Sequence, residues 1–488
     1  MTDKLTSKSA ESSFIQEISV TSNKDRGKSV SITGGTIKLE YFESIVSDGI
    51  KAKVTFIDSG NAIEDKNAVD GLPIVGEETV RLKFTDNNNQ TLDLMMYVNR
   101  VTPLVDLTTK TSTLLVLVSK EGIMNEKVRL NTRFDGKISE HITNILTDPN
   151  YLGTEKDIDI EETTNEYNFV GNNWKPFYAM NWLSKKAVPN LPQAKGNTAG
   201  YFFYETSDGF KFKSIDTLLS QEKKKSIIYN ETPDSKGEKI PEGYDMKALE
   251  YAKDSGVDVQ NKLQMGAFST RTVLFDPFTC YYEVITPNAK EKEDALKLAG
   301  RELPVMNPEF ERPGSNKEFS RTQYMLLDKG SLPSGSGTGK SQEQIQKSKK
   351  ENFEPKDILN QATMRYNQLF TSKTTITIPG DFSLHAGDAI FVDAPSVEKD
   401  PKNDKINKES GGLYIIATLC HYITPTESYT KLELVRDSIG RTGNHSRSTS
   451  SSTKTPPPTS KPAPPTPSTP DTRSNWQRRL DARRGRRN

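Results

Sequence analysis

The sequence predicts a mainly β fold in which an α+β module is inserted between two β-rich blocks, with a C-terminal tail that lacks a core. Three observations support this. Apolar and polar residues alternate in short runs over 14–122 and 374–436, which is typical of half-buried strands. Runs with helical apolar spacing lie between these blocks. After about residue 440 the composition turns to Ser, Thr and Pro, so we expect a disordered or extended tail.

The first block contains six or so short strand-like runs at regular spacing. Gly34-Gly35 and the polar cluster 86–89 supply turn residues between them, since Gly, Asn and Asp reach the backbone angles of tight reversals. This pattern indicates a barrel or a sandwich. The expected strands are 29–32, 36–45, 50–57, 79–84, 92–101 and 111–119.

The middle of the chain reads as an α+β module. Residues 138, 142, 145 and 146 form one apolar helical stripe, with His141 at its boundary. A second helix is expected from Pro176, because proline suits a first helical turn. Residues 200–205 and 209–215 predict a hairpin across a Thr-Ser-Asp-Gly turn.

Downstream of this module the expected elements are mixed. Residues 246–252 and 257–265 look partly helical or irregular, and 267–275 and 280–285 look like paired strands. A charged helix is expected over 291–302, and another helix begins at Pro355. The block 374–436 then forms an antiparallel set with turns at Gly380-Asp381 and Gly387-Asp388.

Bulk composition excludes several classes of protein. With 488 residues the chain is long enough for two to four domains. Lys+Arg is 66 and Asp+Glu is 65, which argues against a surface that wraps nucleic acid. There is no run of eighteen apolar residues and no signal-like apolar N-terminal segment, so we expect no membrane insertion and no secretion signal.

Cysteines and histidines give no metal-site pattern. Cys280 and Cys420 are isolated in strand-like runs and are expected to be buried reduced thiols. The four histidines share no ligand spacing with each other or with the cysteines. The sequence therefore predicts neither a metal ion nor a cofactor.

Three motifs suggest chemistry, and each has a structural interpretation. Ser334–Ser341 nearly matches a phosphate-binding loop, but neither a buried strand before it nor an apolar helix behind it is present. Asp157–Glu162 alternates as an exposed strand edge does and lacks the glycine of a calcium loop. Asp381 and Asp388 follow glycines in turns, where the side chain caps the local backbone. No catalytic residues are predicted.

The end of the tail carries the clearest charge signal. Seven arginines lie between 473 and 487. They are consistent with polyanion binding, with a solubilising tail, or with a short docking peptide on a Pro-rich tether. We favour the docking peptide, because Trp476 and Leu480 lie on one helical face. Its expected partner-binding residues are Trp476, Leu480, Arg478, Arg479, Arg483 and Arg484.

The order of several motifs resembles the central baseplate hub protein of contractile-tailed, T4-like phages. It is more distantly similar to the N-terminal half of type VI secretion spike proteins. The likeness covers roughly 14–440 and lies in the order of the motifs. They are Tyr41-Phe-Glu-Ser-Ile45, Gly49–Gly60, Asn168–Phe177, Trp182–Lys185, Gly200–Phe210, Gly266–Pro277 and the closing block.

The resemblance implies a mechanical, non-enzymatic role. In that family each subunit carries two tail-tube-like barrels, and three subunits form a ring with a pseudo-sixfold face. The implied partners are the chain itself as a homotrimer, the central spike, the tail tube or tube-initiator protein, baseplate wedge proteins and the tape measure protein. DNA is implied only in passage through the channel, and the implied location is the virion baseplate after assembly in the host cytoplasm.

The resemblance also implies a division of the chain, in which the second tube-like antiparallel barrel is discontinuous. The implied segments are an N-terminal arm 1–13, a first barrel 14–122, an α+β insert 123–247 with 290–359, a second barrel 248–289 with 360–440, a Ser/Thr/Pro-rich linker 441–475 and the Arg-rich docking peptide 476–488.

Two alternatives stay open at this point. One is a type VI secretion-like spike component, although 441–488 has no β-helical repeat, so that the spike itself must be another protein. The other is a nucleotide hydrolase that uses the run ending at Lys340 and Ser341.

Overall fold

The computed structural model describes residues 13–24, 27–60, 68–107, 109–190, 198–229, 240, 243–254, 259–266, 270–276, 280–285, 296–303, 309, 319–326, 355–394 and 410–443. The chain divides into two compact units, 1–447 and 448–488, and all described residues belong to the first. This unit is mainly β, and its largest sheet has 14 strands. None of its described helices is long and apolar enough to cross a membrane.

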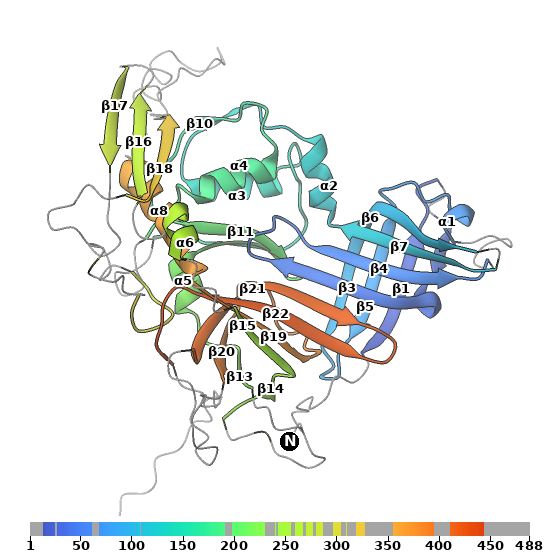
Figure 1. Cartoon of the computed structure of the whole chain (residues 1–488). Helices are drawn as coiled ribbons and strands as arrows, with labels where there is room; N and C mark the ends of the chain where they lie inside the picture. The colour runs from blue at the N-terminus through green and yellow to red at the C-terminus, as the bar shows by residue number, and fades with distance from the viewer. Residues whose placement is uncertain are drawn as a thin grey trace, which may run out of the picture. The chain divides into compact units, whose positions relative to one another are not determined.

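The first barrel consists of seven strands. The strands pair in the order β1-β5-β6-β7-β4-β3, and β2, which leads into β3, pairs with β1. The bent segment β2–β3 therefore closes the barrel. Its strands are β1 Phe14–Thr21, β2 Ser29–Ser31, β3 Thr36–Ser44, β4 Lys51–Asp58, β5 Thr79–Thr85, β6 Thr91–Asp106 and β7 Thr111–Val118, with η1 Thr33–Gly35 and α1 Ala68–Gly71 between strands (Figure 1).

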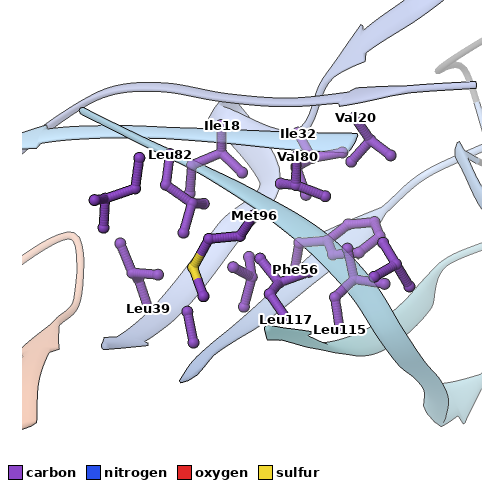
Figure 2. Packing of buried hydrophobic residues seen from close by; sticks show 14 of the residues in the cluster. Ile18, Val20, Ile32, Leu39, Phe56, Val80, Leu82, Met96, Leu115 and Leu117 are labelled. Carbon is purple, nitrogen blue, oxygen red and sulfur yellow. The ribbon is translucent and has the colours of Figure 1, made fainter. Parts of the chain in front are cut away.

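Alternate residues of these strands fill the barrel interior. Figure 2 shows Leu39, Met96 and Leu117 meeting from three strands. Their side chains are buried, and full burial of one such side chain contributes about 1.5–3 kcal/mol. The alternation in the sequence is therefore the inside-outside alternation of a pleated strand, and the expectation of a barrel or sandwich over this block is confirmed as a barrel.

The second barrel is built in the same way from β13, β14, β15 and the closing block. Its strands pair in the order β13-β20-β21-β22-β19-β15, and β14, which leads into β15, pairs with β13. A separate apolar cluster that includes Ile376, Ile416 and Leu432 fills it. Its strands are β13 Lys225–Ile228, β14 Met246–Lys247, β15 Glu250–Asp254, β19 Ser372–Pro379, β20 Ala389–Asp393, β21 Gly412–Ile423 and β22 Ser428–Arg436.

The two barrels thus share one strand order. When β1 is matched to β13, and β4–β7 to β19–β22, each pairing in the first barrel has a counterpart in the second. One difference is that β1 runs antiparallel to β5 whereas β13 runs parallel to β20. The resemblance implied two tube-like barrels, but the shared strand order was not predicted, because it depends on pairings between distant strands.

The insert lies between the barrels in sequence and has its own aromatic-rich core. The helix from Ile138 and the helix from Pro176 form as expected, and so does the hairpin of β11 and β12. Its elements are α2 Lys120–Lys127, β8 Arg133–Phe134, α3 Ile138–Thr147, β9 Ile158–Ile160, β10 Phe169–Val170, α4 Pro176–Ser184, β11 Tyr201–Thr206, β12 Gly209–Ser214 and α5 Ile215–Ser220.

Two expectations about the second barrel were wrong. The strands expected near 267–285, β16 Thr270–Asp276 and β17 Tyr281–Ile285, do not enter the barrel. They form a separate sheet with β18 Arg321–Leu326 (Figure 1). Residues 246–252, expected to be irregular, instead supply β14 and β15. A β-bulge at Leu249 interrupts their alternation, which hid the strand in the sequence.

Other local expectations have mixed outcomes. The helix α8 Pro355–Leu369 is confirmed, and α6 Val259–Met265 accounts for the helical part expected over 257–265. Of the helix expected over 291–302, the described residues 296–302 contain no helical turn. Both cysteines are free as expected, but neither is fully buried: Cys280 is exposed and Cys420 is half-buried. Cys280 lies in a turn with φ of 54° before β17.

Candidate functional site

The two barrels of one chain meet edge to edge, where β3 pairs with β21. Residues 418–423 of β21 form an antiparallel ladder with 39–44 of β3, while 412–415 of the same strand pair with β20. The long strand β21 therefore has two partners along one side. At the change of partner a β-bulge lies between Ile416 and Thr418, and Ala417 O accepts a hydrogen bond from Ile45 N at 2.9 Å.

Ile45 fixes the end of this ladder. Its side chain is buried in the cluster that includes Ala386, Ala417 and Val435 of the second barrel. Because an aliphatic side chain is fully removed from water, this contact adds roughly 1.5–3 kcal/mol to the backbone ladder. The end of β3 is therefore anchored in the neighbouring barrel.

A buried carboxylate, Glu43, joins three parts of the fold. Its oxygens accept hydrogen bonds from Ser207 N at 2.8 Å and Ala386 N at 3.0 Å, and from Tyr41 Oη at 2.9 Å. His385 Nδ1 lies 3.3 Å from Glu43 Oε1. We call Glu43, Ser207, His385 and Ala386 the Glu43 cluster. It connects the first barrel, the turn between β11 and β12, and the loop before β20.

Glu43 and His385 favour each other's charge. Burial raises the pKa of Glu43, but hydrogen bonding and charge from His385 outweigh burial and the pKa is lowered. Burial lowers the pKa of His385, but Glu43 outweighs it and the pKa is raised, with Asp208 contributing. A buried acceptor with several donors and a cation nearby is well satisfied.

His421 extends the contact on the first-barrel side of β21. Its ring stacks on Tyr41 with centroids 6.0 Å apart and an interplanar angle of 9°, and its Nδ1 lies 3.0 Å from Thr430 Oγ1. Burial lowers the pKa of His421 to about 4, so this ring is neutral at pH 7. It acts here as an aromatic packing residue.

Two further buried ion clusters hold the insert against the barrels. Lys156 Nζ bridges Glu121 at 2.7 Å and Glu205 at 2.5 Å, and Glu205 also accepts Ile50 N from the first barrel at 3.1 Å. In the second cluster, Arg365 forms ion pairs with Asp216 at 3.2 Å and with Asp437 at 3.0 Å. All of these carboxylates are buried. Buried pairs of this kind specify one relative placement more than they add stability.

The arrangement suits a mechanical joint. It consists of a backbone ladder, an apolar anchor and buried ion pairs, which together fix the barrels and the insert. Among the described residues no group of three or more His, Cys, Asp or Glu is placed to hold a metal ion.

Several features that the sequence singled out lie within the described residues. Asp381 Oδ1 accepts Ser383 N at 3.0 Å, and Asp388 Oδ2 accepts His385 N at 2.7 Å, which confirms both as turn-capping residues. Asp157–Glu162 contains the edge strand β9, which pairs with β12 only. His141 is buried rather than at a boundary, packed between Phe134 and Phe169.

Other candidates lie outside the described residues. These are the glycine-rich run Ser334–Ser341, the charged loop Val397–Ser410 except for its last residue, and the Arg-rich peptide with Trp476, Leu480, Arg478, Arg479, Arg483 and Arg484.

Sequence reasoning missed the Glu43 cluster, although one signal was present. Leu39, Tyr41, Glu43 and Ile45 occupy alternate positions on one face of β3, and all four are buried. A glutamate on the apolar face of an alternating strand predicts a paired buried carboxylate. Its partners could not be named, because Ser207 and His385 are distant in sequence.

Comparisons with known proteins give structural matches only. No protein-family model matches the chain, and no curated protein matches it. The chain is similar to the 43 kDa tail protein of prophage MuSo2 from Shewanella oneidensis, with a TM-score of 0.46 and 10% identity over 86% of this chain and 98% of that chain.

Two other solved structures extend the likeness. A tail protein from Neisseria meningitidis MC58 has a TM-score of 0.48 and 8% identity over 86% of this chain and 96% of that chain. The E. coli c3393 protein, a component of the type VI secretion system, has a TM-score of 0.38 and 8% identity over 84% of this chain and 76% of that chain.

Proposed function

We propose that this chain is a structural baseplate hub of a contractile phage tail. In this proposal three copies form a ring with a pseudo-sixfold face, which joins a sixfold tail tube to a threefold central spike. The observation that carries it is the presence of two barrels with one strand order in a single chain, joined edge to edge. Three such chains present six similar barrels, which is how a threefold ring can match a sixfold tube.

The rigid joint between the two barrels supports a role in which the chain transmits force. A β ladder, an apolar anchor and the Glu43 cluster fix one barrel against the other, while Lys156 and Arg365 fix the insert. An element that transmits force between a tube and a spike needs such fixed geometry. The proposed partners are the spike, the tail tube or its initiator, and baseplate wedge proteins, and the proposed role is non-enzymatic.

The domain division is proposed with one adjustment. The first barrel keeps 14–122, while the second takes 225–228 and 246–254 together with 372–436. The Arg-rich peptide at 476–488 is proposed to dock one baseplate partner, by way of Trp476 and Leu480 on one helical face.

The test of the ring is the mass of the purified chain. Size-exclusion chromatography with light scattering at micromolar concentration is expected to give three times the chain mass, because ring-closing interfaces of this class are large and stable. A clean monomer over this concentration range contradicts the proposed ring.

A further inference from the structure

Two strand edges of the large sheet have no partner among the described residues. Strand β6 pairs with β5 only over 91–97, so that 99–106 has β7 on one side and no strand on the other. Strand β15 pairs with β19 and has no partner on its outer side. Unpaired edges of this length recruit strands unless they are covered.

The unpaired half of β6 is the counterpart of the half of β21 that binds β3. In β6 a β-bulge lies between Val98 and Arg100, and in β21 the bulge lies between Ile416 and Thr418. Each bulge directly follows the segment that pairs with the shorter neighbouring strand, β5 or β20. The same bond pattern precedes it: Val98 exchanges hydrogen bonds with Glu77 and Glu78 at 2.7 and 2.9 Å, and Ile416 does so with Gly387 and Asp388 at 2.8 and 2.9 Å.

The outer edge of β15 is the counterpart of the β3 edge that binds β21. Leu249 N donates to Thr377 O at the bulge that begins β15, and a bulge between Thr36 and Lys38 begins the matching part of β3. When the pairing of β3 with β4 is aligned with the pairing of β15 with β19, Tyr41 corresponds to Lys253 and Phe42 corresponds to Asp254. Each chain therefore contains one complete contact between barrels. It also presents the two strand edges that a second contact of the same kind needs.

The surface next to the unpaired β6 edge has a hollow at the place where a partner strand would lie. A hollow of about 550 Å³ is lined by residues that include Gly76, Glu77, Val98, Asn99 and Val118. Their counterparts in the second barrel are Ala386, Gly387, Ile416, Ala417 and Val435, and three of these surround the side chain of Ile45. The hollow thus corresponds to the place that Ile45 fills in the joined pair.

Several apolar side chains at this edge are exposed to solvent. Val75 is 86% exposed, and Leu104 and Val105 are 51% and 49% exposed. The counterpart of Val75 is His385, which is largely covered by β3 and the insert. Exposed apolar side chains gathered beside an unpaired strand edge indicate a contact surface.

We propose that β15 of one copy adds to the unpaired half of β6 of the next copy, antiparallel and in the register that β3 uses on β21. This inference rests on the proposed ring and names its closing contact. A head-to-tail contact of this kind generates a closed ring when its rotation divides the circle. Repetition of one barrel contact within and between copies places six barrels around one axis.

The proposed register pairs Asp254 of one copy with Thr102 of the next, and Lys253 with Pro103. The first pair is the counterpart of Phe42 and Cys420, and the second of Tyr41 and His421. Pro103 has no N–H, so this ladder has one donor fewer than that of β3 and β21. Proline at an edge also limits unwanted strand addition, and the hollow beside Val98 then supplies the selectivity.

Disulfide cross-linking tests the register with a control inside the same chain. All variants carry Cys280→Ser, because Cys280 is an exposed free thiol. The control adds Phe42→Cys, which faces native Cys420 across the ladder of β3 and β21 and is expected to form an intrachain disulfide. Directly opposed strand positions have Cα separations of about 4.5–5.5 Å, within the range of a disulfide.

The test variant carries Thr102→Cys and Asp254→Cys in the same background. Mild oxidation of the purified full chain is expected to give covalent trimers on a non-reducing gel, and Thr102→Cys alone is expected to give none. A chain that scatters light as a trimer but forms no interchain disulfide, while the control pair closes, overturns the proposed contact and leaves the ring intact. A monomer by light scattering overturns the ring itself.

A second variant, Lys253→Pro, tests the edge without cysteines. The N–H of Lys253 points to the outer edge, because the matching residues of β3 direct theirs toward β21, as Ile45 N does. The ladder with β19 is therefore kept. The expected result is at least a tenfold loss of trimer affinity with unchanged thermal unfolding of the monomer. An unchanged trimer in a folded variant counts against the contact.

Discussion

At the scale of single residues, Glu43 is a buried contact between the first barrel, the insert and the loop before β20. It accepts hydrogen bonds from Ser207 N and Ala386 N, and His385 Nδ1 lies 3.3 Å from its Oε1. The neighbouring Glu40 on the same strand instead forms a partly exposed ion pair with Lys38 at 3.1 Å. The two glutamates differ in burial, and therefore in what the loss of their charge costs.

We predict that Glu43→Gln destabilises the chain by about 2 kcal/mol or more, because the amide nitrogen of glutamine faces backbone N–H donors and the largely buried His385 loses its carboxylate partner. Glu40→Gln is the matched control and is expected to change stability by less than about 1 kcal/mol. Urea unfolding followed by tryptophan fluorescence measures both. Equal midpoints for the two variants would show that the Glu43 cluster does not hold the barrels.

The sequence indicates Glu43 but not its partners. An acidic residue between Tyr41 and Ile45 on an apolar face marks a buried carboxylate, whereas Ser207 and His385 lie more than a hundred residues away. The two turn aspartates were predicted correctly because capping by Asp381 and Asp388 is local. Local chemistry can be read from one segment, but a contact between distant segments cannot.

At the scale of elements, the loop before β20 and the loop before β5 are counterparts with different residues. Gly387 has φ of 88°, and Glu77 at the matching position has φ of 65°. A Cβ on Gly387 would lie 2.2 Å from Tyr204 Oη of the insert. Glu77 instead lines the hollow beside β6 and forms an exposed ion pair with Lys127. Glycine is therefore required at position 387, where the loop before β20 contacts the insert, and it is not required at position 77 before β5.

We predict that Gly387→Ala destabilises the chain by at least about 2 kcal/mol, since it combines left-handed strain of roughly 1–2 kcal/mol with a clash against a buried tyrosine. The counterpart change, Glu77→Gly, is expected to leave stability within about 1 kcal/mol, because relief of strain offsets added chain entropy. Thermal unfolding by circular dichroism compares the two. A mild effect of Gly387→Ala would mean that Tyr204 and the loop move apart easily.

The sequence predicted which segments form strands better than it predicted which sheet each strand joins. The alternation around Ile376 and Ile378 predicted β19, and the hairpin of β11 and β12 followed from its turn. The bulge at Leu249 concealed β15, and nothing local distinguishes β16 as a member of a separate sheet. A strand sequence encodes its two faces, but its neighbour is chosen by long-range packing.

At the scale of the whole molecule, the order of motifs predicted two barrels flanking an insert, and the structure has both. The repeat of strand order between the barrels could not be predicted, since the matched strands share register and bulges rather than sequence. β3 and β21, the strands that join the barrels, lie at opposite ends of the described chain. Such pairings are fixed only when both barrels have formed.

The Arg-rich peptide 476–488 is proposed to dock a baseplate partner. We predict that deletion of 446–488 leaves the trimer and its unfolding temperature unchanged, because the described barrels end before this segment. Binding to one baseplate partner is expected to weaken at least tenfold. The measurement is pull-down and light scattering of the truncated chain with purified spike, tube and wedge proteins. The tail is expected to act through Trp476 and Leu480 as an anchored helix face.

Two full-length variants separate docking from charge. Trp476→Ala with Leu480→Ala removes the apolar face and is expected to reproduce the deletion. Changing Arg478, Arg479, Arg483 and Arg484 to lysine keeps the charge, and is expected to retain most binding if the partner surface is recognised by the apolar face. Undiminished assembly of the deletion variant with all three partners would remove the docking peptide from the proposal. Loss in the lysine variant alone would instead assign recognition to the guanidinium groups, whose planar fork lysine cannot reproduce.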